Sequence, residues 1–149
     1  MADITTVSVK TTADGERLQR TMDELKKLKL HVGFMPGQNF EKDGTDVAVV
    51  AMRNEFGDDK VPARPFMSQA INNNEKAISK IATQALKEEA PKDILDIIGE
   101  GLSTLIRKEI EKGDFVPNAP STIARKGSDK PLIDTGLMKE SVEHWIDRG

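Results

Sequence analysis

The string of residues most suggestive of catalysis is Asp134-Thr135-Gly136, which follows two apolar residues. Two such carboxylates, one from each of two subunits, can share a proton and act as acid and base on a peptide bond. Hydrolases of that kind are almost entirely β-sheet, whereas residues 137–149 after the motif begin with a helical pattern. Because a three-residue motif is a weak signal, we expect Asp134 or Thr135 to cap a short helical turn instead.

The rest of the chain offers little for catalysis or for binding a metal. It has no cysteine, which excludes disulfides, thiolate zinc sites and thiol nucleophiles. Its two histidines, His31 and His144, lie far apart in the sequence, and no glycine-rich phosphate loop ends in Lys-Ser or Lys-Thr. Residues 43–46 lack the alternating oxygen ligands of a calcium loop. We therefore expect a protein that is not an enzyme and has no cofactor or metal.

The length and net charge of the chain further limit the kinds of protein that it can be. The 149 residues suit a single domain, 1–149, and the formal net charge of -3 lacks the basic excess of a dedicated nucleic-acid binder. No apolar run approaches the roughly 20 residues of a membrane span. The N-terminus has neither the basic region nor the apolar stretch of a signal peptide. We expect a soluble protein that is made in a cytoplasm and has no membrane partner.

The elements at the start of the chain follow from its hydrophobic pattern. Residues 3–10 (DITTVSVK) alternate valine with polar side chains, which predicts a strand with one buried face. Apolar residues at helical spacing predict an amphipathic helix over 15–28, and renewed alternation predicts a strand over 30–34. The valine-rich segment 46–56 fits either a buried strand or a short helix. A capping Thr45 or Asp46 before it and Gly57 after it favour the helix.

Two long helices and a final strand are expected in the rest of the chain. One helix begins at Pro65, and the other spans residues 92–112. Gly99 and Gly101 lower the stability of this second helix by about 1 kcal/mol each relative to Ala, which indicates close approach of another element. Residues 141–147 have the pattern of a strand. The predicted fold is α+β, a small mostly antiparallel sheet with two long helices packed on one face and a long extended loop.

That loop, residues 113–133, is long enough to indicate a function. It contains three prolines, and its bases Arg125, Lys126 and Lys130 outnumber its acid Asp129 between residues 115 and 131. Such a loop can face the phosphates of DNA or an acidic neighbouring protein, and the sequence favours neither.

Four segments in order resemble one protein family. Asn54-Glu-Phe-Gly57, a charged spacer and Val61-Pro-Ala-Arg-Pro-Phe66 are similar to the neck or tail-completion (virion morphogenesis) proteins of long-tailed bacteriophages, of the Mu-like prophage type. The same resemblance extends to Leu30–Phe34, to Pro120–Gly127 and to Pro131–Leu137. It covers residues 28–147 and leaves residues 1–27 unmatched.

The resemblance implies a structural protein of the virion, synthesised in the cytoplasm of the host bacterium. Its copies would form a homo-oligomeric ring, a hexamer, at the head–tail junction and join the tail to the DNA-filled head as neck, tail-completion or tail-terminator protein. Its partners would be the tail-tube and head-side connector proteins. Six subunits of this size leave a lumen on the order of 40 Å, wide enough for packaged DNA to pass through. The alternative is a DNA-binding accessory protein of phage packaging or recombination.

The candidate contacts between subunits or with partners are Glu55, Phe56, Arg64 and Phe66. Pro65 holds Arg64 extended, so its guanidinium can bind a carboxylate such as Glu55 or one in a neighbouring subunit. The alternative is that Arg64 and Glu55 form a local pair and that both phenylalanines belong to the core. In the first case Arg64→Ala yields a folded monomer with impaired assembly, and in the second it destabilises the fold.

Overall fold

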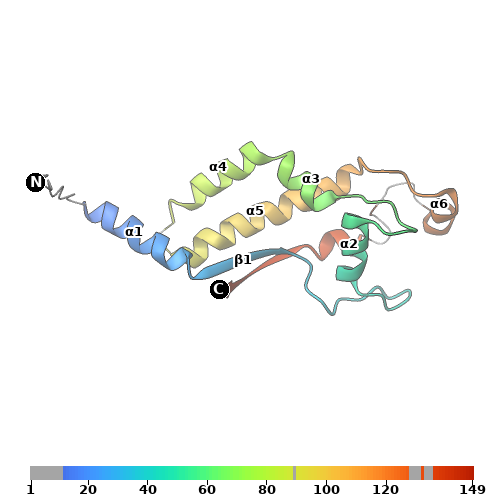
Figure 1. The fold of residues 1–149 in the computed structure, drawn as a ribbon, viewed down its shortest axis with the longest axis horizontal. Helices are drawn as coiled ribbons and strands as arrows, with labels where there is room; N and C mark the ends of the chain where they lie inside the picture. The colour runs from blue at the N-terminus through green and yellow to red at the C-terminus, as the bar shows by residue number, and fades with distance from the viewer. Residues whose placement is uncertain (1–11, 89, 128–131, 133–135) are drawn as a thin grey trace, which may run out of the picture.

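The structure, a computed structural model, describes residues 12–88, 90–127, 132 and 136–149 (Figure 1). As predicted, this part of the chain is α+β, with seven helices and a two-stranded antiparallel sheet. The helices are α1 (Ala13–Leu25), α2 (Val47–Phe56), α3 (Phe66–Asn72), α4 (Glu75–Ala85), α5 (Pro91–Lys112), α6 (Pro120–Lys126) and α7 (Leu137–Glu140), and the strands are β1 (Leu28–Gly33) and β2 (Glu143–Arg148).

Helix α5 is the centre of the molecule. It contacts both strands, and it also contacts α3 and α4, which run along its other side (Figure 1). Pro91 stands at its start and Gly113, in a left-handed conformation, ends it, as the sequence predicts for a helix over 92–112. Ile94, Ile106 and Ile110 are buried along its length.

The two glycines of α5 are the points of close approach that the sequence predicts. A Cβ on Gly99 would overlap the imidazole ring of His144 in β2. A Cβ on Gly101 would lie 2.8 Å from the Cδ1 atom of Ile81 in α4. The helix therefore brings a bare backbone toward the sheet on one side and toward α4 on the other.

The sheet presents two different faces. Its register pairs Leu30 with Ile146 and His31 with Trp145. Since His144 packs on Gly99, the face with Leu30, His144 and Ile146 is the one turned toward α5. On the outer face the rings of His31 and Trp145 stack, with centroids 5.2 Å apart. Both strands are confirmed within one or two residues of their predicted bounds, whereas the predicted strand over 3–10 lies outside the described residues.

The helix predicted to begin at Pro65 is not continuous. It breaks at Asn73 and Asn74 into α3 and α4, and the amide Nδ2 of Asn74 donates to the carbonyl oxygen of Ala70 at 2.8 Å. Asparagine side chains compete with the backbone for hydrogen bonds in this way and weaken helix interiors. Neither piece lies on the sheet face, because both pack on α5. The expected pair of long helices on the sheet is thus one long helix, covered on its far side by two shorter ones.

The segment 113–133 is not wholly extended either. It contains α6, which begins at Pro120 and is ended by Gly127. Proline at the first position of a helix and glycine just after its end are ordinary helix signals, and here they mark a short helix inside the loop. Residues 128–131 and 133 of the segment lie outside the described part of the chain.

The main core lies at the end of the molecule away from α1. It includes Val47 of α2, Phe66 of α3, Ile106 of α5, Met138 of α7 and Val142, the residue just before β2. No helix among the described residues is long and apolar enough to cross a membrane.

Candidate subunit interface

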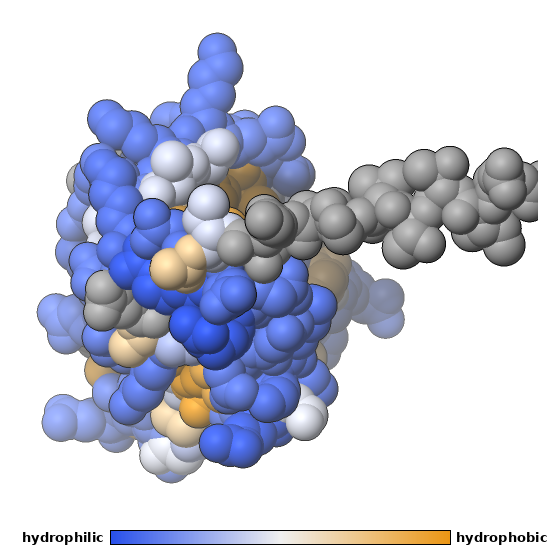
Figure 2. Space-filling model, turned by 90° about the vertical axis from the view of Figure 1, so that its left-hand side faces the viewer, coloured by the Kyte–Doolittle hydropathy of each residue, from blue (hydrophilic) through white to orange (hydrophobic). Residues whose placement is uncertain are grey.

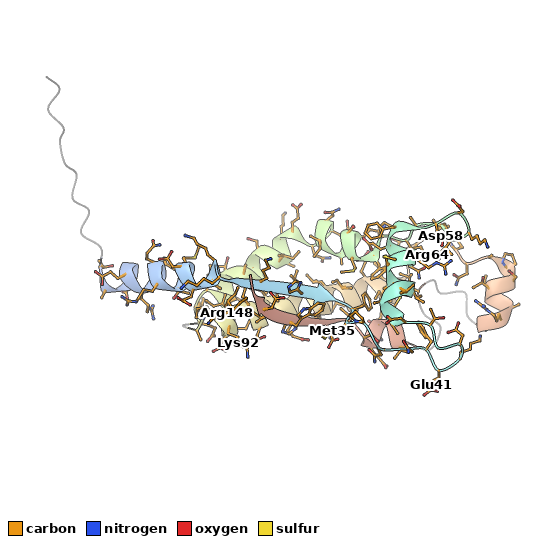
Figure 3. All side chains as sticks on the ribbon, turned by 60° about the horizontal axis from the view of Figure 1, so that its bottom comes forward. Met35, Glu41, Asp58, Arg64, Lys92 and Arg148 are labelled. Carbon is orange, nitrogen blue, oxygen red and sulfur yellow. The ribbon has the colours of Figure 1, made fainter. Side chains whose placement is uncertain are left out.

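Arg64 lies inside the subunit, at the end of the molecule that carries α2 (Figure 3). Only 7% of its surface is exposed. Its Nε donates to the carbonyl oxygen of Val116 at 2.8 Å, and its two terminal nitrogens donate at 3.3 Å to three further oxygens, those of the Asn54 side chain, the Pro117 carbonyl and the Asn118 side chain. These four acceptors are all uncharged. The expected pair of Arg64 with Glu55 is not among the hydrogen bonds or ion pairs of the described chain.

The guanidinium of Arg64 therefore joins two segments of the same chain. It connects the residues around α2 with the residues that lead into α6, more than 50 positions later. Burial lowers the pKa of the Arg64 guanidinium, since desolvation disfavours its charged form. Because its hydrogen-bond donors point into the subunit, Arg64 supports the fold rather than a contact with another subunit.

Glu55 has a different partner from the one the sequence suggests. Its carboxylate accepts hydrogen bonds from the backbone N–H groups of Met67 at 2.9 Å and Ser68 at 3.0 Å, and also from the Ser68 hydroxyl. Pro65, which precedes α3, provides no side-chain cap. A residue of α2 thus caps α3, and its negative charge lies at the positive end of that helix.

Replacing Glu55 with Ala should lower the free energy of unfolding by about 2 kcal/mol, because three donors at the start of α3 lose a charged acceptor. Glu55→Gln keeps one acceptor oxygen and should lose about half as much. Urea unfolding followed by circular dichroism measures both changes. An effect no larger than that of Glu41→Ala, a change at an exposed acid of the preceding loop, would remove Glu55 from this role.

The turn between these two helices has its own hydrogen bonds. Gly57 has φ 72°, and a Cβ there would lie 2.7 Å from the backbone nitrogen of Ala63. Only glycine fits, because the chain folds back tightly on itself. Asp58 holds the turn and accepts from the N–H groups of Lys60 and Val61 at 2.8 Å each. The bond from Lys60, with a further contribution from Arg53, lowers the pKa of Asp58.

The two phenylalanines proposed as contact residues, Phe56 and Phe66, differ sharply in how much of their surface is exposed. Phe66 has no exposed surface and packs edge-to-face on Phe34, with ring centroids 6.0 Å apart. Phe56 is 76% exposed, and Met52, one turn earlier in α2, is 56% exposed. Phe66 is therefore a core residue of the subunit, and Phe56 is available to a partner.

The exposed side chains Val49, Met52 and Phe56, spaced at helical intervals, form what we term the α2 apolar face. Met52 and Phe56 also border a hollow of about 440 Å³ on the outer side of the sheet. Its other walls include Phe34, Met67 and the stacked rings of His31 and Trp145. The sequence pointed to Phe56 through the family motif, but hydrophobicity alone did not indicate that this face of α2 is exposed.

The basic loop residues are only partly placed. Arg125 lies in α6, is exposed, and borders a wider hollow of about 920 Å³ that Arg64 and Asn118 also reach. Asp43 is one of the acids that also border this hollow. A hydrogen bond from the N–H of Thr45 lowers the pKa of Asp43, and the charges of Lys42 and Arg125 contribute less. Lys126 ends α6, and Lys130 lies outside the described residues. The described rim therefore carries both signs of charge.

Asp134 and Thr135 also lie outside the described residues, so the capping role expected for them stays a prediction. The described residue before α7 is Gly136, which has no side chain to serve as a cap. Within the described ranges, no group of three or more His, Asp or Glu residues is placed to hold a metal ion. Comparison with protein-family models, with curated proteins and with solved structures finds no match.

Proposed function

We propose that this chain is a structural subunit of a long-tailed bacteriophage that forms a ring at the head–tail junction. The observation that carries the proposal is the set of hydrogen bonds made by Arg64. They join the segment Asn54–Phe66 to residues 116–118, directly before Pro120–Gly127. Two stretches that resemble the neck and tail-completion proteins thus belong to one structural unit, at one end of the molecule.

The shape and surface of the subunit are compatible with a ring. The molecule is elongated, with α1 at one end and α2 and α6 at the other (Figure 1). Unlike ends allow head-to-tail contacts, and such contacts close into a ring when the rotation between neighbours permits. The α2 apolar face supplies the kind of exposed hydrophobic surface that marks a protein contact. In this proposal the ring is a hexamer that contacts tail-tube and head-side connector proteins and lets DNA pass through its lumen.

The direct test is electron microscopy of phage lysates produced with this gene inactivated. We expect filled heads and tails lying apart, or tails of uncontrolled length. Unjoined tails of normal length assign the protein to head–tail joining, and tails of uncontrolled length make it the tail terminator. Intact infectious particles would remove the junction role and favour a DNA-binding accessory protein instead.

A surface substitution tests the same proposal at the level of residues. Phe56→Ser combined with Met52→Ser should abolish infectious particles while leaving the free energy of unfolding within about 0.5 kcal/mol of the parent, because both side chains are exposed. Plaque titre after complementation of the inactivated gene measures the first effect. The matched control is Leu86→Ser, which removes an exposed apolar side chain just after the end of α4 and should complement fully. Full complementation by the double variant would exclude the α2 apolar face as a contact.

A further inference from the structure

Helix α1 extends beyond the rest of the molecule as an arm (Figure 1). None of its residues is buried, and Leu18 and Met22, one turn apart, are 54% and 43% exposed. The end of the molecule that carries α1 is otherwise mostly hydrophilic (Figure 2). Although the helix contacts α5 and β1, the part of its apolar side formed by Leu18 and Met22 is left largely uncovered by the described part of its own chain.

The sheet is likewise incomplete. It has two strands, and neither outer edge pairs with another strand of the described chain. A two-stranded sheet is marginal by itself, and an open edge presents unpaired N–H and C=O groups to any strand that approaches. Residues 3–10 have the alternating pattern of a strand, and they join the free end of α1.

We propose that residues 3–10 of one copy of this chain pair with an open edge of the β1–β2 sheet of a second copy. Helix α1 is the arm that carries the strand across, and Leu18 and Met22 face the second copy. This inference rests on the proposed function only in that copies of the chain assemble with one another.

The length of the segment explains why a second copy is required. Helix α1 is about 20 Å long, at 1.5 Å per residue over its 13 residues. Residues 3–10 span about 26 Å when extended. Because β1 leads away from the end of α1 (Figure 1), a segment that doubled back within its own chain would run mostly beside α1 and reach only the first residues of β1. A sheet edge in another copy has no such restriction.

The exchange also gives the contact a direction. The donor strand and the acceptor edge are different surfaces of the subunit, so each copy donates to one neighbour and accepts from another. Such a heterologous contact continues from subunit to subunit until it closes, which is how a ring forms. Main-chain hydrogen bonds supply the affinity of an added strand, and the alternating side chains determine its register.

Proline substitution tests the pairing directly. Val7→Pro removes a ladder donor in the middle of the segment and should raise the dissociation constant between subunits by roughly tenfold or more. Sedimentation velocity measures this constant, and circular dichroism should show unchanged helix content and melting. Ala2→Pro, outside the segment, is the matched control and should leave the constant unchanged. A constant unaffected by Val7→Pro would overturn the strand exchange.

Cross-linking determines whether the strand crosses to a second copy, and the absence of native cysteine makes every introduced thiol unique. A chain with Val7→Cys is mixed with a differently tagged chain carrying Lys29→Cys in β1 or Asp147→Cys in β2, and a short bismaleimide is added. We expect a product that contains both tags from at least one edge, and none from Ser79→Cys on α4. An assembly that forms without this product would overturn the strand exchange and leave the ring proposal standing. A chain that stays monomeric at all concentrations would overturn both.

Discussion

Replacing Arg64 with Ala should lower the free energy of unfolding by about 3 kcal/mol, because it removes a charged donor from several oxygens at once. The carbonyl oxygens of Val116 and Pro117 and the side-chain oxygens of Asn54 and Asn118 all lose a donor. Their loss also frees the chain around residue 117 from α2. The defect in assembly first expected for this variant should then follow from the loss of folded protein.

Urea unfolding of Arg64→Ala followed by circular dichroism measures the change. Arg53→Ala is the matched control, since Arg53 lies in the same region and pairs on the surface with Asp58 at 2.8 Å. An exposed ion pair contributes little, so the control should change stability by less than about 1 kcal/mol. If Arg64→Ala is as stable as Arg53→Ala yet fails to assemble, Arg64 belongs to the subunit interface after all.

Gly99→Ala should lower the free energy of unfolding by about 2 kcal/mol, although Ala favours a helix over Gly by about 1 kcal/mol. The added methyl group overlaps the ring of His144, and its distance to the Cβ of His144 is 2.9 Å. Because His144 is fixed within β2, either the strand or α5 has to move. The effect therefore reverses the sign that helix propensity alone predicts.

Two comparisons isolate the cause of this loss. Gly101→Ala meets the flexible end of Ile81 instead of a ring, so it should change stability by no more than about 1 kcal/mol. His144→Ala removes the ring and keeps the Cβ. In that background the loss caused by Gly99→Ala should become smaller, and a double-mutant cycle measures the difference as coupling. An equal loss in both backgrounds would show that the contact with His144 is not its origin.

The elements that the sequence predicted well carry local signals. Helix α2 could be separated from a strand because Thr45 and Asp46 before it are both capping types. In the structure Asp46 is the cap, and its carboxylate accepts from the N–H of Ala48 at 2.8 Å. This bond and a bond from the N–H of Gly37, the larger contribution, lower the pKa of Asp46. Gly99 and Gly101 likewise predicted the close approach of other elements to α5, because glycine lowers helix stability relative to alanine.

The features that the sequence did not predict depend on tertiary contacts or on competing local bonds. Two of the four acceptors of Arg64 are backbone carbonyls more than 50 residues away, and any residue type supplies a carbonyl. The sequence suggested Arg64 as the partner of Glu55, whereas its carboxylate accepts from backbone N–H groups at the start of α3, which a sequence does not display. The division between α3 and α4 lies where the Asn74 side chain bonds to the carbonyl oxygen of Ala70, and the apolar periodicity of the sequence continues through it.

The stacked rings of His31 and Trp145 lie beside Met52 and Phe56, on the outer side of the sheet. Trp145 is the single tryptophan of the chain, and there is no tyrosine. Emission excited in the indole band therefore comes from this one place, and its wavelength follows the polarity around the ring. The protein thus carries an intrinsic optical probe of anything that covers the hollow beside α2, and mixing it with candidate partners reports contact there without any attached label.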